Sequence, residues 1–130
     1  MSKIVLLVDK DQEFLNKVSK KLTGDGYSVV LAKNEEDAIK ELKSIKPDIM
    51  ISEIIFDRPD GGLALAYHAK KINPKLIIVL ISDLENRCGI RLDVMQTEQK
   101  KWIHADAILS KPVRYEQIIS TLARLETVTK

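Results

Sequence analysis

The chain has 130 residues, of which 45% are apolar and 31% are charged, and its formal net charge is +2 at pH 7. This length suits one domain, spanning residues 1–130, with a hydrophobic core of its own. The near-balanced charges argue against a nucleic-acid-binding domain. The first apolar run, residues 4–8, is too short for a signal sequence or a membrane span. We therefore expect a cytoplasmic protein with no membrane or nucleic-acid partner.

The first half of the chain alternates apolar runs with apolar helical stripes. Residues 4–8 form a continuous apolar run, which is typical of a strand buried on both faces of a parallel sheet. Apolar side chains then recur at helical spacing over residues 14–22. A weaker strand at residues 27–31 resembles an edge strand, and Asn34 suits the N-cap of a second helix. A third strand follows at about residues 48–52.

The second half repeats this alternation. A third helix begins near Gly62, and a strand follows at residues 76–81. The next apolar stripe predicts a fourth helix that continues towards Trp102, and a last strand at residues 107–109 precedes a fifth helix with Pro112 in its first turn. Five strands alternating with five helices predict an α/β fold, namely a doubly wound parallel sheet covered by helices on both faces.

Ionisable and hydroxyl side chains follow the carboxyl ends of these predicted strands. In an open α/β sheet, sites form at this edge, so we expect these side chains to share a pocket. They are Asp9, Lys10, Asp11, Glu53, Ser82 and Lys111. The first loop lacks a glycine-rich phosphate-binding sequence, which argues against a nucleotide or flavin binder of the same fold.

Four segments, in this order, resemble the receiver domain of two-component response regulators. They are Leu7-Val8-Asp9 and residues 46–51, 73–82 and 105–112, and the resemblance extends over essentially the whole chain. It implies a flavodoxin-like, doubly wound (βα)5 sandwich whose five-stranded parallel sheet has the strand order 2-1-3-4-5. Receiver domains take a phosphoryl group from a histidine kinase onto an aspartate at the end of the third strand. They use a Mg²⁺ ion held by that aspartate and by acids after the first strand, while a hydroxyl and a lysine contact the phosphoryl oxygens.

The resemblance assigns family roles by position. The acceptor position is Glu53, the first acid is Asp9, the hydroxyl is Ser82 and the lysine is Lys111. The second acid falls on Lys10. The acceptor is therefore a longer carboxylate than in the family, and a principal metal ligand is replaced by a cation.

These departures predict a pocket without metal. Mg²⁺ requires oxygen ligands in near-octahedral order, and the ammonium of Lys10 removes one and repels the ion. We therefore expect no metal and no other cofactor, with Lys10 or Lys111 paired with Glu53. Asp11 is expected to cap the following helix. The alternative is that Asp11 turns into the pocket and completes a metal-binding set with Asp9 and Glu53.

The resemblance thus predicts an atypical receiver domain, or pseudo-receiver, which is not an enzyme and acts in phosphorelay signalling as a protein-interaction module. The alternative is a phosphorylation-competent receiver that uses Glu53, or a nearby acid such as Asp57, with Mg²⁺. The implied partners are a histidine kinase or an output domain, bound through the face formed by the fourth helix, fifth strand and fifth helix. Dimerisation through this face is a further family behaviour. The aromatic residue of the family's switch is replaced by Ile108.

Overall fold

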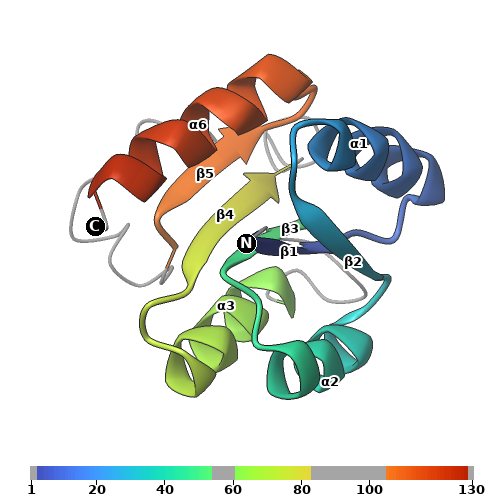
Figure 1. Cartoon of the computed structure of the whole chain (residues 1–130). Coiled ribbons are helices and arrows are strands. Elements are labelled where there is room, and N and C mark those ends of the chain that lie inside the picture. Colours follow the sequence, from blue (N-terminus) through green and yellow to red (C-terminus); the bar gives the residue numbers. More distant parts are fainter. Residues whose placement is uncertain (1–2, 54–60, 83–104, 129–130) are drawn as a thin grey trace.

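The computed structural model describes residues 3–53, 61–82 and 105–128, with the side chains of 61–64 and 127–128 left out of the description. Within these ranges the chain forms a parallel sheet with helices on both faces (Figure 1). None of the helices in the described ranges is long and apolar enough to cross a membrane.

Five strands and four helices lie in the described residues. The strands are β1 (Ile4–Val8), β2 (Ser28–Ala32), β3 (Ile49–Glu53), β4 (Ile77–Ser82) and β5 (Ala107–Ser110). The helices, labelled as in Figure 1, are α1 (Gln12–Gly24), α2 (Glu35–Ile45), α3 (Gly61–Ile72) and α6 (Tyr115–Val128). All neighbouring strands pair in parallel, in the order β2-β1-β3-β4-β5. This confirms the predicted α/β, flavodoxin-like fold and its strand order.

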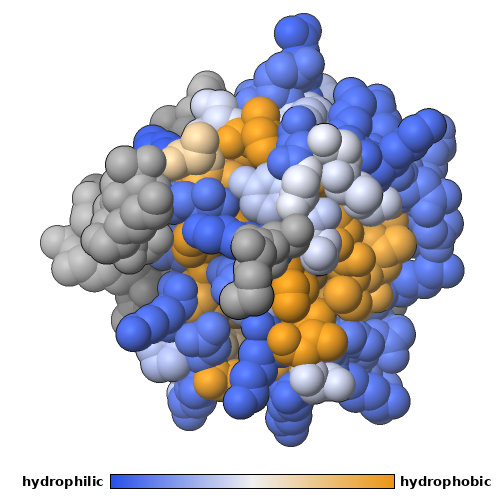
Figure 2. All heavy atoms as spheres, in the orientation of Figure 1, coloured by the Kyte–Doolittle hydropathy of each residue, from blue (hydrophilic) through white to orange (hydrophobic). Residues whose placement is uncertain are grey.

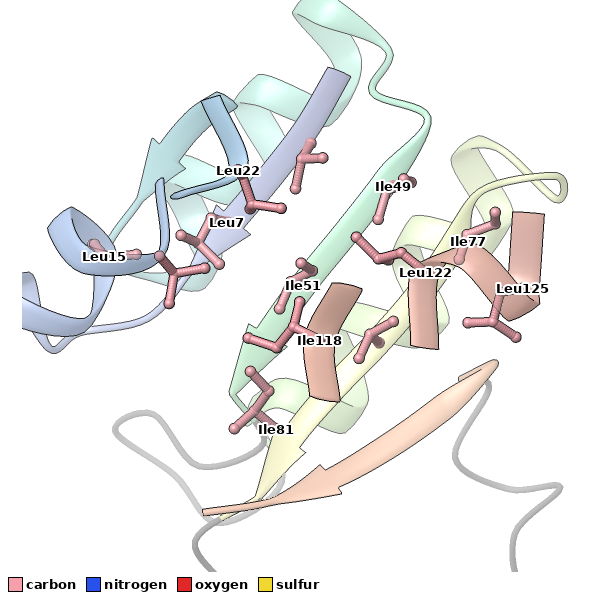
Figure 3. Close-up of a cluster of buried hydrophobic side chains, with 13 residues drawn as sticks. Leu7, Leu15, Leu22, Ile49, Ile51, Ile77, Ile81, Ile118, Leu122 and Leu125 are labelled. Carbon is pink, nitrogen blue, oxygen red and sulfur yellow. The ribbon is translucent and has the colours of Figure 1, made fainter. Parts of the chain in front are cut away.

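Two apolar clusters sandwich the sheet because successive strand residues point to opposite faces. Helices α1 and α6 cover one face, and α2 and α3 cover the other (Figure 1). The first cluster, shown in Figure 3, includes Leu7, Ile51, Ile81, Leu15, Ile118 and Leu122. The second includes Leu6, Met50, Leu80, Leu42 and Leu65. On the face shown in Figure 2, hydrophilic residues cover much of the surface, with apolar patches between them.

Local signals fix where the helices begin and end. The side chain of Asn34 accepts a hydrogen bond of 2.8 Å from the Asp37 N–H and caps α2, as predicted. Helix α2 ends at Lys46, which has the left-handed φ of 49°, and Pro47 follows. Gly26, with φ of 98°, makes the turn between α1 and β2.

One predicted boundary is wrong. Pro112 does not lie in the first turn of the last helix, because α6 begins only at Tyr115. The helix is instead opened by Arg114, whose carbonyl accepts from the N–H groups of Gln117 and Ile118 and whose N–H donates to Gln117 Oε1 at 2.8 Å. Pro112 belongs to the connection from β5 and follows Lys111 through a cis peptide bond.

Other predictions lie outside the described residues. These include the helix expected between Ser82 and Trp102, and Asp57, the other acid considered as an acceptor. The fourth helix belongs to the face at which the resemblance places partners, so the structure describes this face only through β5 and α6. The role of the face therefore stays a prediction.

Candidate functional site

The predicted site residues gather at the carboxyl edge of the sheet. Asp9 directly follows β1, Glu53 ends β3, Ser82 ends β4 and Lys111 directly follows β5. Strands β1, β3, β4 and β5 lie side by side and run parallel, so the ends of these strands lie at one edge of the sheet. Asp9, Glu53 and Ser82 are buried, with 1%, 6% and 1% of their surfaces exposed. The strand order thus brings together the residues that the sequence analysis selected.

Asp9 is satisfied on both carboxylate oxygens. Its Oδ2 lies 3.3 Å from the Nζ of Lys111, in an ion pair. Its Oδ1 accepts a hydrogen bond of 2.9 Å from the backbone N–H of Asp11. A buried carboxylate without such partners would carry a large desolvation cost, and the ammonium supplies the opposite charge that lowers this cost.

Lys111 is directed into the pocket by its surroundings. Its Nζ lies 5.1 Å from the centroid of the Phe14 ring, within the range of a cation–π contact. Its backbone N–H donates to the carbonyl of Ser82 at 2.8 Å, which fastens the start of the β5 connection to the end of β4. The side chain is 23% exposed. The lysine therefore enters the pocket, as the resemblance predicts.

Glu53 occupies the acceptor position and accepts from a backbone group, whereas Asp9 pairs with an ammonium. Its Oε1 accepts a hydrogen bond of 3.1 Å from the backbone N–H of Lys10. Burial raises the pKa of Glu53 above its ordinary value of 4.5, and the negative charge of Asp9 raises it further. The N–H of Lys10 and the charges of Lys111 and Lys10 lower the pKa, but the net direction is upward. Glu53 is therefore harder to ionise than an exposed glutamate.

The pairing differs from the one predicted. The sequence analysis placed Lys10 or Lys111 on Glu53, whereas the ion pair described above joins Lys111 to Asp9. Lys10 contacts Glu53 through its backbone N–H, and the residue itself is exposed. Each carboxylate accepts one backbone N–H, but Asp9 is the more deeply buried of the two, with 1% of its surface exposed against 6% for Glu53, and it therefore gains more from a counter-charge.

Asp11 caps helix α1, as predicted, and does not complete a metal site. Its Oδ1 accepts from the backbone N–H groups of Glu13 at 3.1 Å and Phe14 at 3.3 Å. Among the described residues, no group of three or more His, Cys, Asp or Glu side chains is placed to hold a metal ion. The alternative set of Asp9, Asp11 and Glu53 is thus not brought together, and the residues described here do not fit the oxygen shell of Mg²⁺.

Two residues next to the predicted site residues escaped the sequence analysis. Phe14 was assigned only to the apolar stripe of α1, but its ring also faces the ammonium of Lys111. Its position in the first turn, three residues after the capping Asp11, was a usable signal that it lies at the rim. Ser52 donates through Oγ to the carbonyl of Glu53 at 3.0 Å. No sequence pattern distinguished that hydroxyl from an ordinary strand serine.

Comparison with known proteins gives this geometry a context. The model of the "Response regulator receiver domain" family matches residues 5–123. The transcriptional regulatory protein GlrR of Escherichia coli is 32% identical over 78 residues, which are 60% of this chain and 17% of that protein. The response regulator MprA of Mycobacterium bovis is 26% identical over 130 residues, covering 100% of this chain and 53% of MprA. The chain thus spans about half, or less, of the length of these relatives.

Solved structures agree with the fold. A response regulator receiver protein from Sinorhizobium medicae superposes with a TM-score of 0.78 at 26% identity, covering 99% of this chain and 98% of that one. A CheY-like receiver domain protein from Methanospirillum hungatei superposes with a TM-score of 0.80 at 19% identity, covering 99% and 97%. The second likeness concerns the fold alone.

Proposed function

The chain belongs to the response regulator receiver domain family, and we propose that it is an atypical member, a pseudo-receiver that acts in phosphorelay signalling as a protein-interaction module without aspartyl phosphorylation. The observation that carries this proposal is the Lys111–Asp9 ion pair beside Glu53, in the pocket where the family performs phosphoryl transfer. In this proposal the 130-residue chain is one receiver-like domain without enzymatic activity, located in the cytoplasm.

The acceptor position argues against efficient phosphoryl transfer. Glutamate carries its carboxylate about one bond length further from the backbone than aspartate, and a misplacement of ~1 Å can cost ~100-fold in a reaction that depends on positioning. One oxygen of Glu53 also accepts the N–H of Lys10, and the raised pKa favours the protonated form, which is the weaker nucleophile. Both effects act against attack by Glu53 on a phosphodonor.

The charges around Asp9 argue against Mg²⁺. The ammonium of Lys111 already neutralises this carboxylate, and Lys10 stands where the family has a second acid. A divalent cation would have to displace the ammonium and enter a pocket with fewer oxygen ligands than Mg²⁺ prefers. The pocket is therefore neutralised by its own lysines, and its conformation is held by the ion pair instead of by a metal and a phosphoryl group.

A module of this kind would work through partner binding. We propose a histidine kinase or an output domain as partner, docked on the face that β5 and α6 help to form, with dimerisation through the same face as a further use. Ile108 supports a departure from the family's switch, because it packs against the apolar cluster on the α2 and α3 side and offers no aromatic ring to change rotamer.

Phosphorylation can be tested directly by intact mass. The chain is incubated with acetyl phosphate and Mg²⁺, alongside the variant K10D/E53D, which restores the family's acids. We expect no mass change in the natural chain and a gain of one phosphoryl group in the double variant. The matched control K10D/E53N lacks the acceptor carboxylate and should gain nothing.

The competing function predicts a different result. If the chain is a phosphorylation-competent receiver, the natural protein gains one phosphoryl group, and Glu53→Gln abolishes the gain if Glu53 is the acceptor. A gain that survives Glu53→Gln would point to another acid, such as Asp57. Either result would overturn the proposal of a pseudo-receiver.

A further inference from the structure

The edge of the sheet opposite the acceptor pocket carries two neighbouring hollows. They flank the turn at residues 73–75. In Figure 1 this turn is the stretch where the chain passes from α3 to β4. The larger has a volume of about 470 Å³ and lies against the beginnings of β3 and β4. The smaller, of about 280 Å³, lies between the ends of α2 and α3. This edge has no part in the chemistry of the carboxyl edge.

Lysines dominate the walls of both hollows. Lys3, Lys70 and Lys75 line the larger, and Lys43 and Lys46 line the smaller. The acids of the lining are two aspartates in the larger hollow, so the lysines exceed them by three charges. The formal net charge of the whole chain is only +2. Lys3 also forms an ion pair of 3.7 Å with Glu126 of α6, which reduces the excess at this edge to two positive charges, as many as the whole chain carries.

The two aspartates are turned towards the backbone. Asp48 Oδ2 accepts a hydrogen bond of 2.9 Å from the N–H of Ile4. Asp106 Oδ2 accepts one of 2.7 Å from the N–H of Ile78 and also pairs with Lys70 at 3.1 Å. One oxygen of each carboxylate is thus held by a backbone N–H of the adjacent strand, although both residues are exposed. Of the lysines in the larger hollow, only Lys70 is directly paired with one of these aspartates.

Helix dipoles account for only part of the basic character. Lys43 and Lys70 lie in the last turns of α2 and α3, where a cation is favoured by the helix dipole. Lys3, Lys46 and Lys75 lie outside the helices. Lys46 even adopts a left-handed conformation with φ of 49°, which glycine would adopt at lower cost. A favourable position in the last turn of a helix therefore explains Lys43 and Lys70, but not the other three lysines of this edge.

Apolar groups lie between these charges. Leu42, Pro47 and Ile72 contribute to the smaller hollow, and Ile72 is 38% exposed. Pro74 and Leu76 contribute to the larger. A surface that alternates cations with apolar recesses complements a protein segment better than a nucleic acid, because the phosphate backbone would meet apolar groups and the two aspartates.

We propose that this edge, defined by Lys3, Lys43, Lys46, Lys70 and Lys75, is a docking surface for an acidic partner segment with interspersed apolar side chains. The segment's carboxylates meet the lysines on either side of the turn, and its apolar side chains enter the two hollows. Positive charge at this edge also attracts an acidic segment during diffusional encounter. The surface is independent of Glu53, so it serves the chain whether or not the acceptor pocket is active.

The test uses the full chain and a synthetic peptide in which pairs of glutamates alternate with leucines. In ¹⁵N-resolved NMR we expect saturable shifts at the backbone amides of Lys3, Lys46 and Lys75, weakened by salt, and none at Asp9 or Glu53. The variant K46G/K75A removes two charges, and the glycine relieves the left-handed residue, so the fold is kept. We expect this variant to bind the peptide about tenfold more weakly.

The control K17A/K20A removes two exposed lysines from α1 and should leave the affinity within about twofold. If both double variants weakened peptide binding equally, the effect would come from the net charge of the chain and not from this edge, and the proposal would be overturned. Absence of peptide binding would overturn it as well. Single-stranded DNA that bound the same amides more tightly would assign the surface to nucleic acid, and saturation by inorganic phosphate alone would assign it to small anions. None of these readouts depends on phosphorylation, so failure here is distinct from failure of the pseudo-receiver proposal.

Discussion

Asp9 and Glu53 stand at the carboxyl ends of neighbouring strands as two buried carboxylates with different partners. Asp9 has the ammonium of Lys111, and Glu53 has the neutral N–H of Lys10. An ammonium compensates a buried negative charge better than a neutral donor does. Burial first and the negative charge of Asp9 second raise the pKa of Glu53, and the N–H of Lys10 and the lysine charges offset this rise only in part.

Loss of Lys111 should destabilise the fold. Lys111→Ala leaves the Asp9 carboxylate buried without its counter-charge. We expect this change to lower the free energy of unfolding by about 1–3 kcal/mol. The loss should be smaller than for a fully buried ion pair because the lysine is partly exposed. Urea unfolding at pH 7 measures this. The matched control Lys17→Ala removes an exposed lysine from α1 and should change stability by less than about 0.5 kcal/mol. Equal stabilities of the two variants would show that the ion pair contributes nothing.

Glu53 should make stability depend on pH in a defined direction. Because its folded-state pKa is raised, protonation favours the folded state, and this contribution is full below pH 4.5 and is lost as pH rises through the folded-state pKa. Glu53→Gln keeps an oxygen that can accept from Lys10 N–H and removes the charge beside Asp9. The variant should therefore be more stable than the natural chain at pH 7, with the difference shrinking as pH approaches 4.5. Urea unfolding of both proteins from pH 4 to 8, as a rough range, measures the difference. A difference that does not vary with pH would contradict the assignment.

At the scale of elements, helix α1 connects the pocket to the core through its first turn. Asp11 caps the helix, and Phe14, three residues on, faces Lys111. Leu15 and Leu22 of the same helix lie in the cluster beneath α1 and α6. The start of α1 is thus fixed by a cap on one side and by packing on the other, which holds the loop after β1 in place.

Two substitutions at Asp11 separate capping from metal binding. Asp11→Asn keeps a good N-cap side chain without the charge and should change stability by only a few tenths of a kcal/mol. Asp11→Ala removes the cap and should cost about 1 kcal/mol. Thermal unfolding of both variants, without and with Mg²⁺, measures this. If Asp11→Asn abolished a stabilisation by Mg²⁺ that the natural chain showed, Asp11 would be a metal ligand instead of a cap.

The elements were largely predictable because their signals are local. The apolar run at residues 4–8 and the cap at Asn34 reappear as β1 and the start of α2. Other strands begin or end one residue away from the prediction, as expected when hydrogen-bond registers decide the ends. Pro112 was misplaced because a proline suits a helix start by its φ, while the actual start is set by the bonds between Arg114 and Gln117.

In the molecule as a whole, the residues that gather in the pocket could be predicted from the sequence, but the ion pair between them could not. Strand order alone brings Asp9, Glu53, Ser82 and Lys111 to one edge, and the family pattern supplied that order. Which carboxylate pairs with the lysine depends on how deeply each carboxylate is buried and on the path of the Lys111 side chain past Phe14. Neither can be predicted from the neighbouring residues in the sequence.

Other contacts between residues far apart in the chain could not be predicted from the sequence either. Tyr27 before β2 donates to Glu126 of α6 at 3.1 Å, across 99 positions of the chain, and Tyr115 of α6 donates to Asp25 after α1. Burial and these acidic partners raise the pKa of Tyr27 to about 12. Such contacts follow from the packing of α1 and α6 side by side, which the sequence implies only once the fold is known.

We propose that the Lys111–Asp9 pair occupies the pocket in place of a metal ion. A Mg²⁺ titration of the natural chain, followed by ¹⁵N-resolved NMR at the backbone amides of Lys10 and Glu53, tests it most directly, with K10D/E53D as the variant that restores the family's acids. We predict no saturable shift in the natural chain at millimolar Mg²⁺ and a saturable shift at these amides in the double variant. Saturable millimolar binding by the natural chain at these amides would contradict the claim.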